Sequence, residues 1–355
     1  MKKVGSNIEN IAKTNRISGI QRVVIETHKV LKLSLVDSNI SLNGILTRGD
    51  ELSTNCNSSV YYKSDPVLYG DRISVSEVDL LLLLDLDYNI DFKLIYATKK
   101  SKKVKVLAVI YDLIPILTPE FFHEEDANRF RFYIQYLSRV CDYIVFNSDK
   151  VKSDFLSLGW QFHAELFVIH LGAYEKNYVS PFYTKASKSI ICVSTIEPRK
   201  NHIQIINAFD ELLQMGFSFH LNIVGNYGWK FAEELILNHS EYGSRLRWFR
   251  NLNDAEVSRL YRSSSIALSA SVQEGFGLNI EEALANRTKV IANDIAPFNE
   301  RKQDNLYFYN GETSDLINRI LEVEEIPWRE ENYSKIRTMN DFGKELASLI
   351  VEILE

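Results

Sequence analysis

Short apolar runs alternate with longer amphipathic stretches through the second half of this 355-residue chain, and this alternation restricts the possible folds most. Each run has the length of a strand rather than that of a buried helix. The runs are Ile190–Ser194, His220–Val224, Leu246–Phe249, Ile266–Ala270, Lys289–Ala292 and Leu306–Tyr309. We expect helices between most of them, because the stretch after Asn201 gathers its apolar residues on one helical face. The pattern predicts an α/β fold with a doubly wound parallel sheet.

The first half shows the same alternation less sharply. Residues 104–110 are apolar except for Lys105, which is typical of a strand buried on both faces of a parallel sheet. Further strands are predicted at 3–8, 40–46, 79–84, 142–146 and 167–170, and helices at 18–33, 130–140, 147–158 and 333–354. The length suggests two domains, and a polar stretch at 172–188 suggests where they meet. We predict domains over residues 1–175 and 176–335, with a C-terminal helix over 336–355 packing back toward the first.

Composition excludes several classes of protein. A net charge of −6 provides no overall basic surface for nucleic acid. The three scattered cysteines, Cys56, Cys141 and Cys192, lack metal-ligand spacing and fit a reducing cytoplasm. The N-terminus lacks the apolar core of a signal peptide, and apolar runs such as Leu80–Leu84 are far too short to span a bilayer. We therefore expect a cytoplasmic protein whose only membrane contact is peripheral, at the inner face.

The strand predicted at 266–270 leads into Glu274-Gly275-Phe276-Gly277-Leu278, the first candidate site. Its glycines let the backbone approach a ligand closely, and we expect Asn279 to cap the helix that follows. Glu274 and Glu282 would point toward one crevice at the carboxyl end of the strand, where open α/β sheets bind ligands. Asn279 and Glu282 also match a capping box, so Glu282 has an ordinary structural interpretation as well.

A second candidate site follows the strand predicted at 190–194. Arg199 and Lys200 lie in the loop between this strand and the next helix. Arginine offers a bidentate fork for phosphate and lysine a compact point charge, so the pair could offset the charge of a departing diphosphate. A solvated Arg-Lys pair in a turn is the alternative. Gly225 marks a third junction of strand and turn, which is a weak nucleotide signal by itself.

Three weaker candidates lie in the first half. Ser18 can cap a helix, while Gly19 lets backbone face a ligand. Asp112 ends the strand at 104–110, where an Asx-turn is the structural alternative. Asp85 and Asp87 follow another strand and could hold a metal and a nucleotide diphosphate, although two solvated aspartates at a strand end are common.

Carboxylates, cations and glycine turns at the strand ends of one sheet suit a sugar joined to a nucleotide diphosphate. With these motifs the chain resembles the retaining glycosyltransferases of family four, which have the GT-B fold of two Rossmann-like domains with a cleft between them. Glu274–Leu278 followed by Glu282 matches the E-x7-E signature of that family, and Ile196–Asn201 resembles its diphosphate loop. Ile223–Gly225 with Gly228-Trp229, and Ser18–Val23, are similar too. The resemblance covers nearly the whole chain.

The resemblance implies a role for each matched residue. Glu274 would bind hydroxyls of the donor sugar, Glu282 the ribose, and Arg199 with Lys200 the diphosphate leaving group. The residues that would bring backbone close to the donor are Gly19, Gly225, Gly275, Phe276, Gly277 and Leu278. The family needs no metal or other cofactor, and its departing phosphate takes the proton of the acceptor, so no enzyme nucleophile is nominated. The first domain would bind the acceptor and the second the nucleotide sugar.

Three departures from the family pattern stand out. Many relatives carry His-Asp where this chain has Tyr111-Asp112, so Asp112 is a catalytic candidate but no catalytic histidine is. Many carry proline at the position of Asn279, and the glycine usual after the E-x7-E helix is missing at 285–288. These departures bear on the acceptor and on the choice of donor more than on the reaction.

The sequence therefore predicts a hexosyltransferase that uses a nucleotide sugar, with GDP-mannose as the first choice and rhamnose, glucose or galactose donors open. The expected acceptor is a glycan or polyprenyl-linked glycan in the assembly of a surface polysaccharide such as O-antigen or capsule. One alternative is a metal-dependent transferase that uses Asp85 and Asp87. Another is a non-catalytic partner that binds sugar nucleotides within a glycosyltransferase complex.

Overall fold

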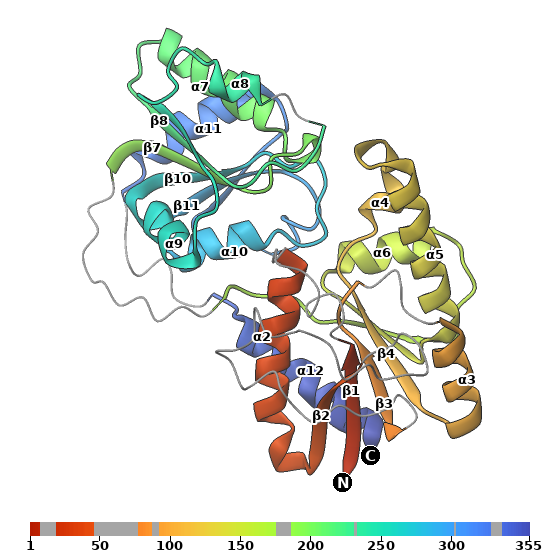
Figure 1. Cartoon of the computed structure of the whole chain (residues 1–355). Helices are drawn as coiled ribbons and strands as arrows, with labels where there is room; N and C mark the ends of the chain where they lie inside the picture. The colour runs from red at the N-terminus through yellow and green to blue at the C-terminus, as the bar shows by residue number, and fades with distance from the viewer. Residues whose placement is uncertain are drawn as a thin grey trace. The chain divides into compact units, whose positions relative to one another are not determined.

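The computed structural model describes residues 1–7, 19–45, 77–86, 92–174, 186–230, 233–301, 303–327 and 336–355. All other residues are grey in Figure 1. The chain forms two compact units. Unit 1 comprises Met1–Gly172 and Thr338–Glu355, and unit 2 comprises Ala173–Arg337. Within the described ranges each unit contains a six-stranded sheet.

The sheet of unit 2 has the strand order β12-β11-β10-β7-β8-β9, and all neighbouring strands are parallel. Its strands are β7 (Ala186–Val193), β8 (His220–Val224), β9 (Leu246–Phe249), β10 (Ser264–Ser269), β11 (Lys289–Asn293) and β12 (Leu306–Tyr309). The order reverses between β7 and β10, and ligands of doubly wound sheets bind beyond the carboxyl ends of the strands at such a switch point. The loops after β7 and β10 carry Arg199-Lys200 and Glu274, so the topology brings the two candidate sites together.

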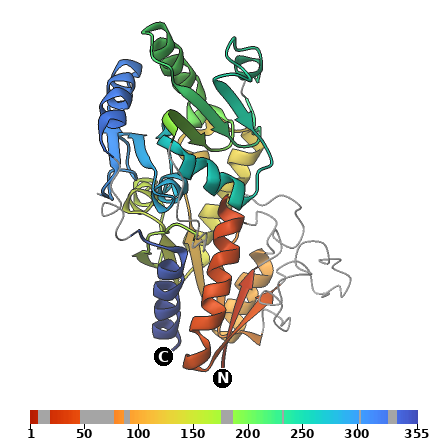
Figure 2. The ribbon, with the colours of Figure 1, turned by 90° about the vertical axis from the view of Figure 1, so that its left-hand side faces the viewer.

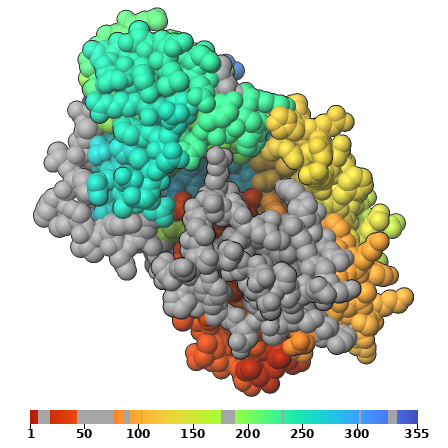
Figure 3. All heavy atoms as spheres, viewed as in Figure 1, coloured from red at the N-terminus to blue at the C-terminus, as the bar shows by residue number. Residues whose placement is uncertain are grey.

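Helices cover both faces of this sheet (Figure 1). One face carries α7 (His202–Gln214), α8 (Glu234–Leu237) and α11 (Thr313–Glu325), and the other carries α9 (Asp254–Ser263) and α10 (Leu278–Ala285). Successive residues of a strand point to opposite faces, so Ile266 joins the first core and Ala267 the second. The space-filling view in Figure 3 shows residues of α8 and α9 in turquoise on the surface of this unit.

The sheet of unit 1 is also parallel, with the order β2-β1-β3-β4-β5-β6. Its strands are β1 (Lys2–Asn7), β2 (Ile40–Ile45), β3 (Leu80–Leu83), β4 (Lys105–Ile110), β5 (Tyr143–Phe146) and β6 (Glu165–Val168). The four leucines of β3 are fully buried, as expected for a strand covered on both faces. Together the two sheets confirm the predicted α/β class with doubly wound parallel sheets.

The helices of unit 1 form two groups. One hydrophobic core joins the sheet to α3 (Phe92–Lys102), α4 (Ile114–Leu117), α5 (Glu124–Val140) and α6 (Asp149–Ser157). Elsewhere in the unit, α2 (Gly19–Ser34) packs against α12 (Met339–Leu354), and both views show the two helices side by side (Figures 1 and 2). Gly343 permits this approach, because a Cβ atom there would lie 2.5 Å from Val30 Cγ1. Short 3-10 helices occur at Val36–Ser38 and Pro119–Phe121.

Several element boundaries differ from the predicted ones. Helix α5 begins at Glu124 rather than at Phe130. Carboxylates in its first turn stabilise the helix N-terminus, but this turn lacks the apolar periodicity from which the helix was predicted. Helix α12 begins at Met339 rather than at residue 333, because the Thr338 side chain accepts the Asp341 backbone N–H and caps it. Helices α3 and α4 were not predicted; α3 is rich in lysine and α4 is a single turn. None of the helices in the described ranges is long and apolar enough to cross a membrane.

Candidate active site

Two loops of unit 2 are joined at the switch point of the sheet. The loop after β7 contains the 3-10 helix η5 (Pro198–Lys200), and the loop after β10 contains Glu274. The Val272 backbone N–H donates to the Arg199 carbonyl at 3.0 Å, and Arg199 Nη1 donates to the Gln273 carbonyl at 2.9 Å. These bonds hold the two loops together although they are far apart in the sequence.

Four charged side chains form one network across these loops. Arg199 donates from Nη1 to Glu274 Oε2 at 2.8 Å and from Nη2 to Glu197 Oε1 at 2.6 Å. Lys200 Nζ donates to Glu274 Oε1, which also accepts the Ser271 hydroxyl at 2.7 Å. The four charged side chains are largely buried, from 2% exposed for Glu197 to 15% for Arg199. Two cations and two carboxylates balance, so the network as a whole is neutral.

The network controls the protonation of its carboxylates. Burial alone would raise the pKa of Glu274, but the charges of Arg199 and Lys200, with hydrogen bonds from Lys200 and Ser271, outweigh it and lower the pKa to about 2. Burial raises the pKa of Glu197, and the neighbouring cations counteract this only in part. Glu274 is therefore firmly ionised at neutral pH, and Glu197 is the carboxylate of the network that takes up a proton more readily.

Two backbone features shape the loop after β7. Asn201 has a left-handed backbone with φ 52° where η5 ends and α7 begins, a conformation that asparagine tolerates better than most residues. Gly225, after β8, has φ 151°, and a Cβ atom there would lie 1.9 Å from the Ser194 carbonyl oxygen. The glycine at 225 is thus required by close backbone packing inside unit 2, while its role toward a donor stays a prediction.

Gly277 sets the start of α10. Its φ is 94°, and a Cβ atom there would lie 2.3 Å from Phe298 Cε1. Gly277 is the N-cap residue and the helix begins at Leu278, so the prediction that Asn279 caps this helix is wrong. The left-handed glycine turns the chain into the helix two residues earlier than expected. Asn279 lies in the first turn instead, and its Nδ2 donates to Ser269 Oγ at 3.1 Å.

The other candidates of unit 2 lie along the same turn and helix. Gly275 and Phe276 are buried, and Leu278 is half-buried. Glu282 is a half-buried residue of α10 whose carbonyl accepts Asn286 Nδ2 at 2.7 Å. The alternative interpretation of Glu282 as part of a capping box with Asn279 is wrong, because Gly277 occupies the N-cap position.

The candidates of unit 1 have local structural roles. Gly19 is the first residue of α2. Asp112 Oδ1 accepts the Ile114 backbone N–H at 3.2 Å, the Asx-turn that leads into α4. Asp85 is buried after β3, and its carbonyl accepts Asn7 Nδ2 and the Tyr133 hydroxyl at 3.2 Å each. Asp87 lies outside the described residues, so the Asp85–Asp87 pair remains untested.

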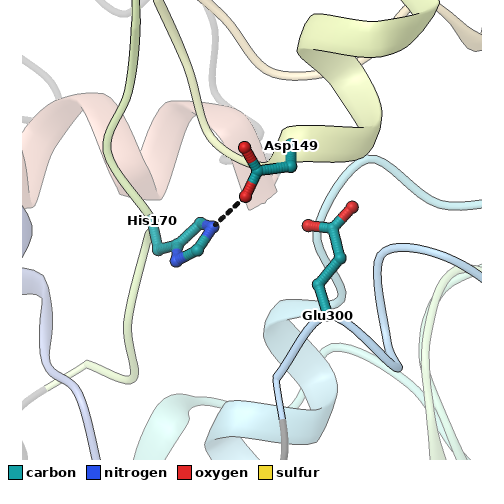
Figure 4. Close-up of side chains that lie close together, drawn as sticks. All are labelled: Asp149, His170 and Glu300. Atoms are coloured by element: carbon teal, nitrogen blue, oxygen red, sulfur yellow. Dashed lines mark ion pairs between the residues drawn. The ribbon is translucent and has the colours of Figure 1, made fainter.

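A separate ion pair of unit 1 joins Asp149, the first residue of α6, to His170 after β6 (Figure 4). Asp149 Oδ2 lies 3.7 Å from His170 Nε2. Glu300, drawn in the same figure, belongs to unit 2. We therefore assign no metal site to this group of three side chains.

Two sets of residues near Glu274 were not predicted from the sequence. Glu197 and Ser271 belong to the network itself. For Glu197, an acidic residue two positions before Arg199 in a Pro-containing loop was a usable signal. The second set, Glu281 with Arg301, carries no local signal, because the two residues meet only through the fold of unit 2.

Two parallel doubly wound sheets with helices define the GT-B fold, as predicted. The solved structure of Anabaena Alr3699/HepE in complex with UDP and glucose has this fold, with a TM-score of 0.63 at 16% identity over 100% of this chain and 98% of that one. At that identity the likeness concerns the fold alone.

Sequence comparison supports the resemblance. Residues 180–338 match the model of the glycosyl transferases group 1, which confirms the resemblance of the second unit. The chain is 28% identical over 281 residues to the serotype-specific mannosyltransferase WbdA of Escherichia coli, which covers 73% of this chain and 34% of that protein. It is 23% identical to the O-antigen chain mannosyltransferase RfbU of Salmonella typhimurium, over 61% of this chain and 60% of that one. The chain thus spans about a third of the length of WbdA.

Proposed function

We propose that this protein transfers a hexose from a nucleotide diphosphate sugar to a glycan or lipid-linked acceptor, with retention of the anomeric configuration. The observation that carries this proposal is the bonding of Glu274 to both Arg199 and Lys200 at the switch point of the unit 2 sheet. Carboxylates accept hydrogen bonds from sugar hydroxyls, and arginine and lysine bind phosphate oxygens. One small network therefore offers recognition for both parts of such a donor.

The reaction exchanges one bond of the anomeric carbon for another. The bond from this carbon to the phosphate oxygen breaks, and a bond to the acceptor oxygen forms on the same face of the sugar. Negative charge develops on the departing diphosphate, where Arg199 and Lys200 stabilise it. The departing phosphate oxygen takes the proton of the acceptor hydroxyl, so protons and charge balance without an enzyme nucleophile.

The charge balance of the network implies that partners exchange when the donor binds. Glu274 and Glu197 together neutralise Arg199 and Lys200 in the structure, and a diphosphate brings further negative charge to the same two cations. Lys200 has a flexible stem and can turn to the phosphate, which releases Glu274 to accept sugar hydroxyls. Arg199 stays held by Glu197 throughout.

GDP-mannose is the first choice of donor, because WbdA and RfbU are both named mannosyltransferases. UDP-glucose is the leading alternative, since the HepE structure holds UDP and glucose. The name of RfbU, an O-antigen chain mannosyltransferase, supports an acceptor in surface-polysaccharide assembly. On the acceptor side we keep Asp112 as a catalytic candidate, and in unit 1 Gly19 as a backbone contact to the donor.

A thermal-shift screen of the purified protein against nucleotide sugars tests the proposal, since a ligand that binds only the folded state raises its melting temperature. The panel holds GDP-mannose, UDP-glucose, UDP-galactose and a rhamnose donor, and each hit is then assayed for slow hydrolysis of the donor. We expect one donor to raise the melting temperature and to be hydrolysed. Binding without hydrolysis or transfer favours the non-catalytic alternative. Activity that chelator abolishes and Mn²⁺ restores favours the metal-dependent one.

A further inference from the structure

A second buried charge pair of unit 2 lies beside the turn that carries Glu274. Arg301 Nη1 donates to Glu281 Oε1, which also accepts Gln303 Nε2 at 2.7 Å. The Glu281 side chain is 1% exposed and that of Arg301 is 11% exposed. Neither residue belongs to the network of Glu274, Arg199 and Lys200, and neither has a role in the proposed reaction.

Arg301 holds the turn at Phe276 in two ways. Its Nη2 donates to the Phe276 carbonyl at 2.5 Å, and its guanidinium carbon lies 3.7 Å from the centre of the Phe276 ring. The same segment after β11 supplies Phe298, whose ring lies where a side chain at Gly277 would be. The segment therefore fixes two consecutive residues of the turn, immediately after Gly275 and Glu274.

Stability alone does not account for this pair. Removing two charges from water is costly, and apolar side chains of similar size often replace a buried ion pair without loss of stability. Glu281 Oε2 and Arg301 Nε are buried and have no hydrogen-bond partner within the described part of the chain, which adds to the cost. The contact that an apolar pair could not reproduce is the hydrogen bond from Arg301 to the Phe276 carbonyl.

We propose that Arg301 is a positioning residue for the donor sugar. Through Phe276 it fixes the backbone that presents Glu274, and Glu281 in turn fixes the guanidinium plane of Arg301. The inference rests on the proposed function and adds to it the residues that set the geometry of the sugar contact. A displacement of about 1 Å at a reacting group can cost roughly 10²-fold in rate, so a small shift of this turn has a measurable effect.

The experiment compares wild type with three variants. The double variant Glu281→Met/Arg301→Met fills the same space without charge. Arg301→Lys keeps a positive charge but loses the planar fork and the stacking on Phe276. The matched control is Arg319→Gln/Glu322→Gln, which removes an ion pair of α11 in the same unit. For each protein we measure the melting temperature, the affinity for the nucleoside diphosphate alone, and kcat/KM for the nucleotide sugar.

We expect the double variant to melt within a few degrees of wild type and to bind the nucleoside diphosphate within about twofold, because Arg199 and Lys200 are untouched. Its kcat/KM for the nucleotide sugar should fall at least tenfold, roughly the effect of a displacement well under 1 Å. Arg301→Lys should show the same selective loss, and the control should match wild type. A purely structural role would lower the affinity for the nucleoside diphosphate and kcat/KM together with the melting temperature.

Results that differ from these expectations overturn either the proposed function or the positioning role of Arg301. A wild-type protein that binds no nucleotide sugar overturns the proposed function and this inference with it. With an active wild type, a folded double variant whose kcat/KM equals that of wild type overturns the positioning role alone. If the double variant does not fold, Arg301→Lys decides, and wild-type kcat/KM in that variant is the overturning result.

Discussion

Glu197 Oε1 accepts a hydrogen bond from Arg199 Nη2 at 2.6 Å, and the Glu197 side chain is 2% exposed. Because Arg199 also bonds Glu274 through its other terminal nitrogen, its guanidinium group is held from both sides. Lys200 has no such fixed plane and carries its charge on a flexible chain. The two cations thus differ in kind, because the Arg199 guanidinium is held by two carboxylates whereas Lys200 reaches Glu274 through a flexible chain.

Loss of Lys200 or Glu274 should reduce catalysis strongly. We expect Lys200→Ala and Glu274→Ala each to lower turnover at least ~10²-fold, as for the loss of preorganised charge stabilisation. Turnover is measured as the initial rate of each variant with the donor identified in the thermal-shift screen. Lys344→Ala, at an exposed position of α12, is the control and should retain wild-type turnover. Near-normal turnover in both folded site variants would refute the assignment.

Replacing Glu274 by glutamine should separate binding from turnover. The carboxylate competes with a diphosphate for Arg199 and Lys200, so Glu274→Gln should bind the nucleoside diphosphate more tightly, by about tenfold if one charge-assisted hydrogen bond is released. Turnover should fall, because the amide is a weaker acceptor for sugar hydroxyls. Titration calorimetry gives the affinity. Weaker binding of the diphosphate in this variant would contradict the exchange of partners.

Gly277 should tolerate no side chain. In Gly277→Ala the new methyl group would lie 2.3 Å from Phe298 Cε1, and φ is 94°. Gly159→Ala, at φ 65° with open space around it, isolates the backbone strain, which is roughly 1–2 kcal/mol. We expect Gly277→Ala to lose more free energy of unfolding than this control, and Gly277→Ala/Phe298→Leu to recover part of the difference. Equal losses in the two alanine variants would show that Phe298 does not confine the turn.

The buried His28 of α2 should make unit 1 sensitive to acid. Burial, with a smaller contribution from the charge of Lys32, lowers the pKa of His28 from 6.5 to about 4. Between these values the unfolded chain binds a proton that the folded unit does not, so stability falls as pH decreases from 6.5 to about 4. The total is about 3 kcal/mol at 1.4 kcal/mol per pH unit.

The variant His28→Leu should flatten this dependence, since leucine fills similar space and does not titrate. The pH dependence is measured by urea unfolding of wild type and variant at a series of pH values, with a spectroscopic probe in unit 1 that reports its unfolding. His123→Gln, at an exposed position, is the control and should keep the wild-type slope. An unchanged slope in His28→Leu would exclude His28 as its source.

Much of the fold was predictable because strand ends are marked in the sequence. The apolar run that became β10 ends shortly before Glu274, and the run that became β7 ends shortly before Arg199, so both loops could be placed at one edge of a parallel sheet. The cap predicted at Asn279 was wrong, because the left-handed backbone of Gly277 overrides the propensity of asparagine for helix caps. The roles assigned to the site residues stay predictions.

The pairing of Glu281 with Arg301 could not be anticipated. The two residues lie on α10 and on the segment after β11, and only the packing of that segment against the turn brings them together. Glu281 also stands next to Glu282 in the sequence, where the E-x7-E pattern directs attention to its neighbour. Sequence periodicity reports burial along one element, but it contains no information on which buried charges meet across elements.

Unit 1 is assembled from two distant parts of the chain, because α12 returns to pack against α2 after unit 2 is complete. During translation, all of unit 2 is therefore synthesised while the apolar face of α2 still lacks its cover. The nascent protein needs Gly343 and its neighbours to emerge before that face is closed to water. A truncation just before Thr338 would leave every residue of the Glu274 network in place and still expose unit 1 to aggregation.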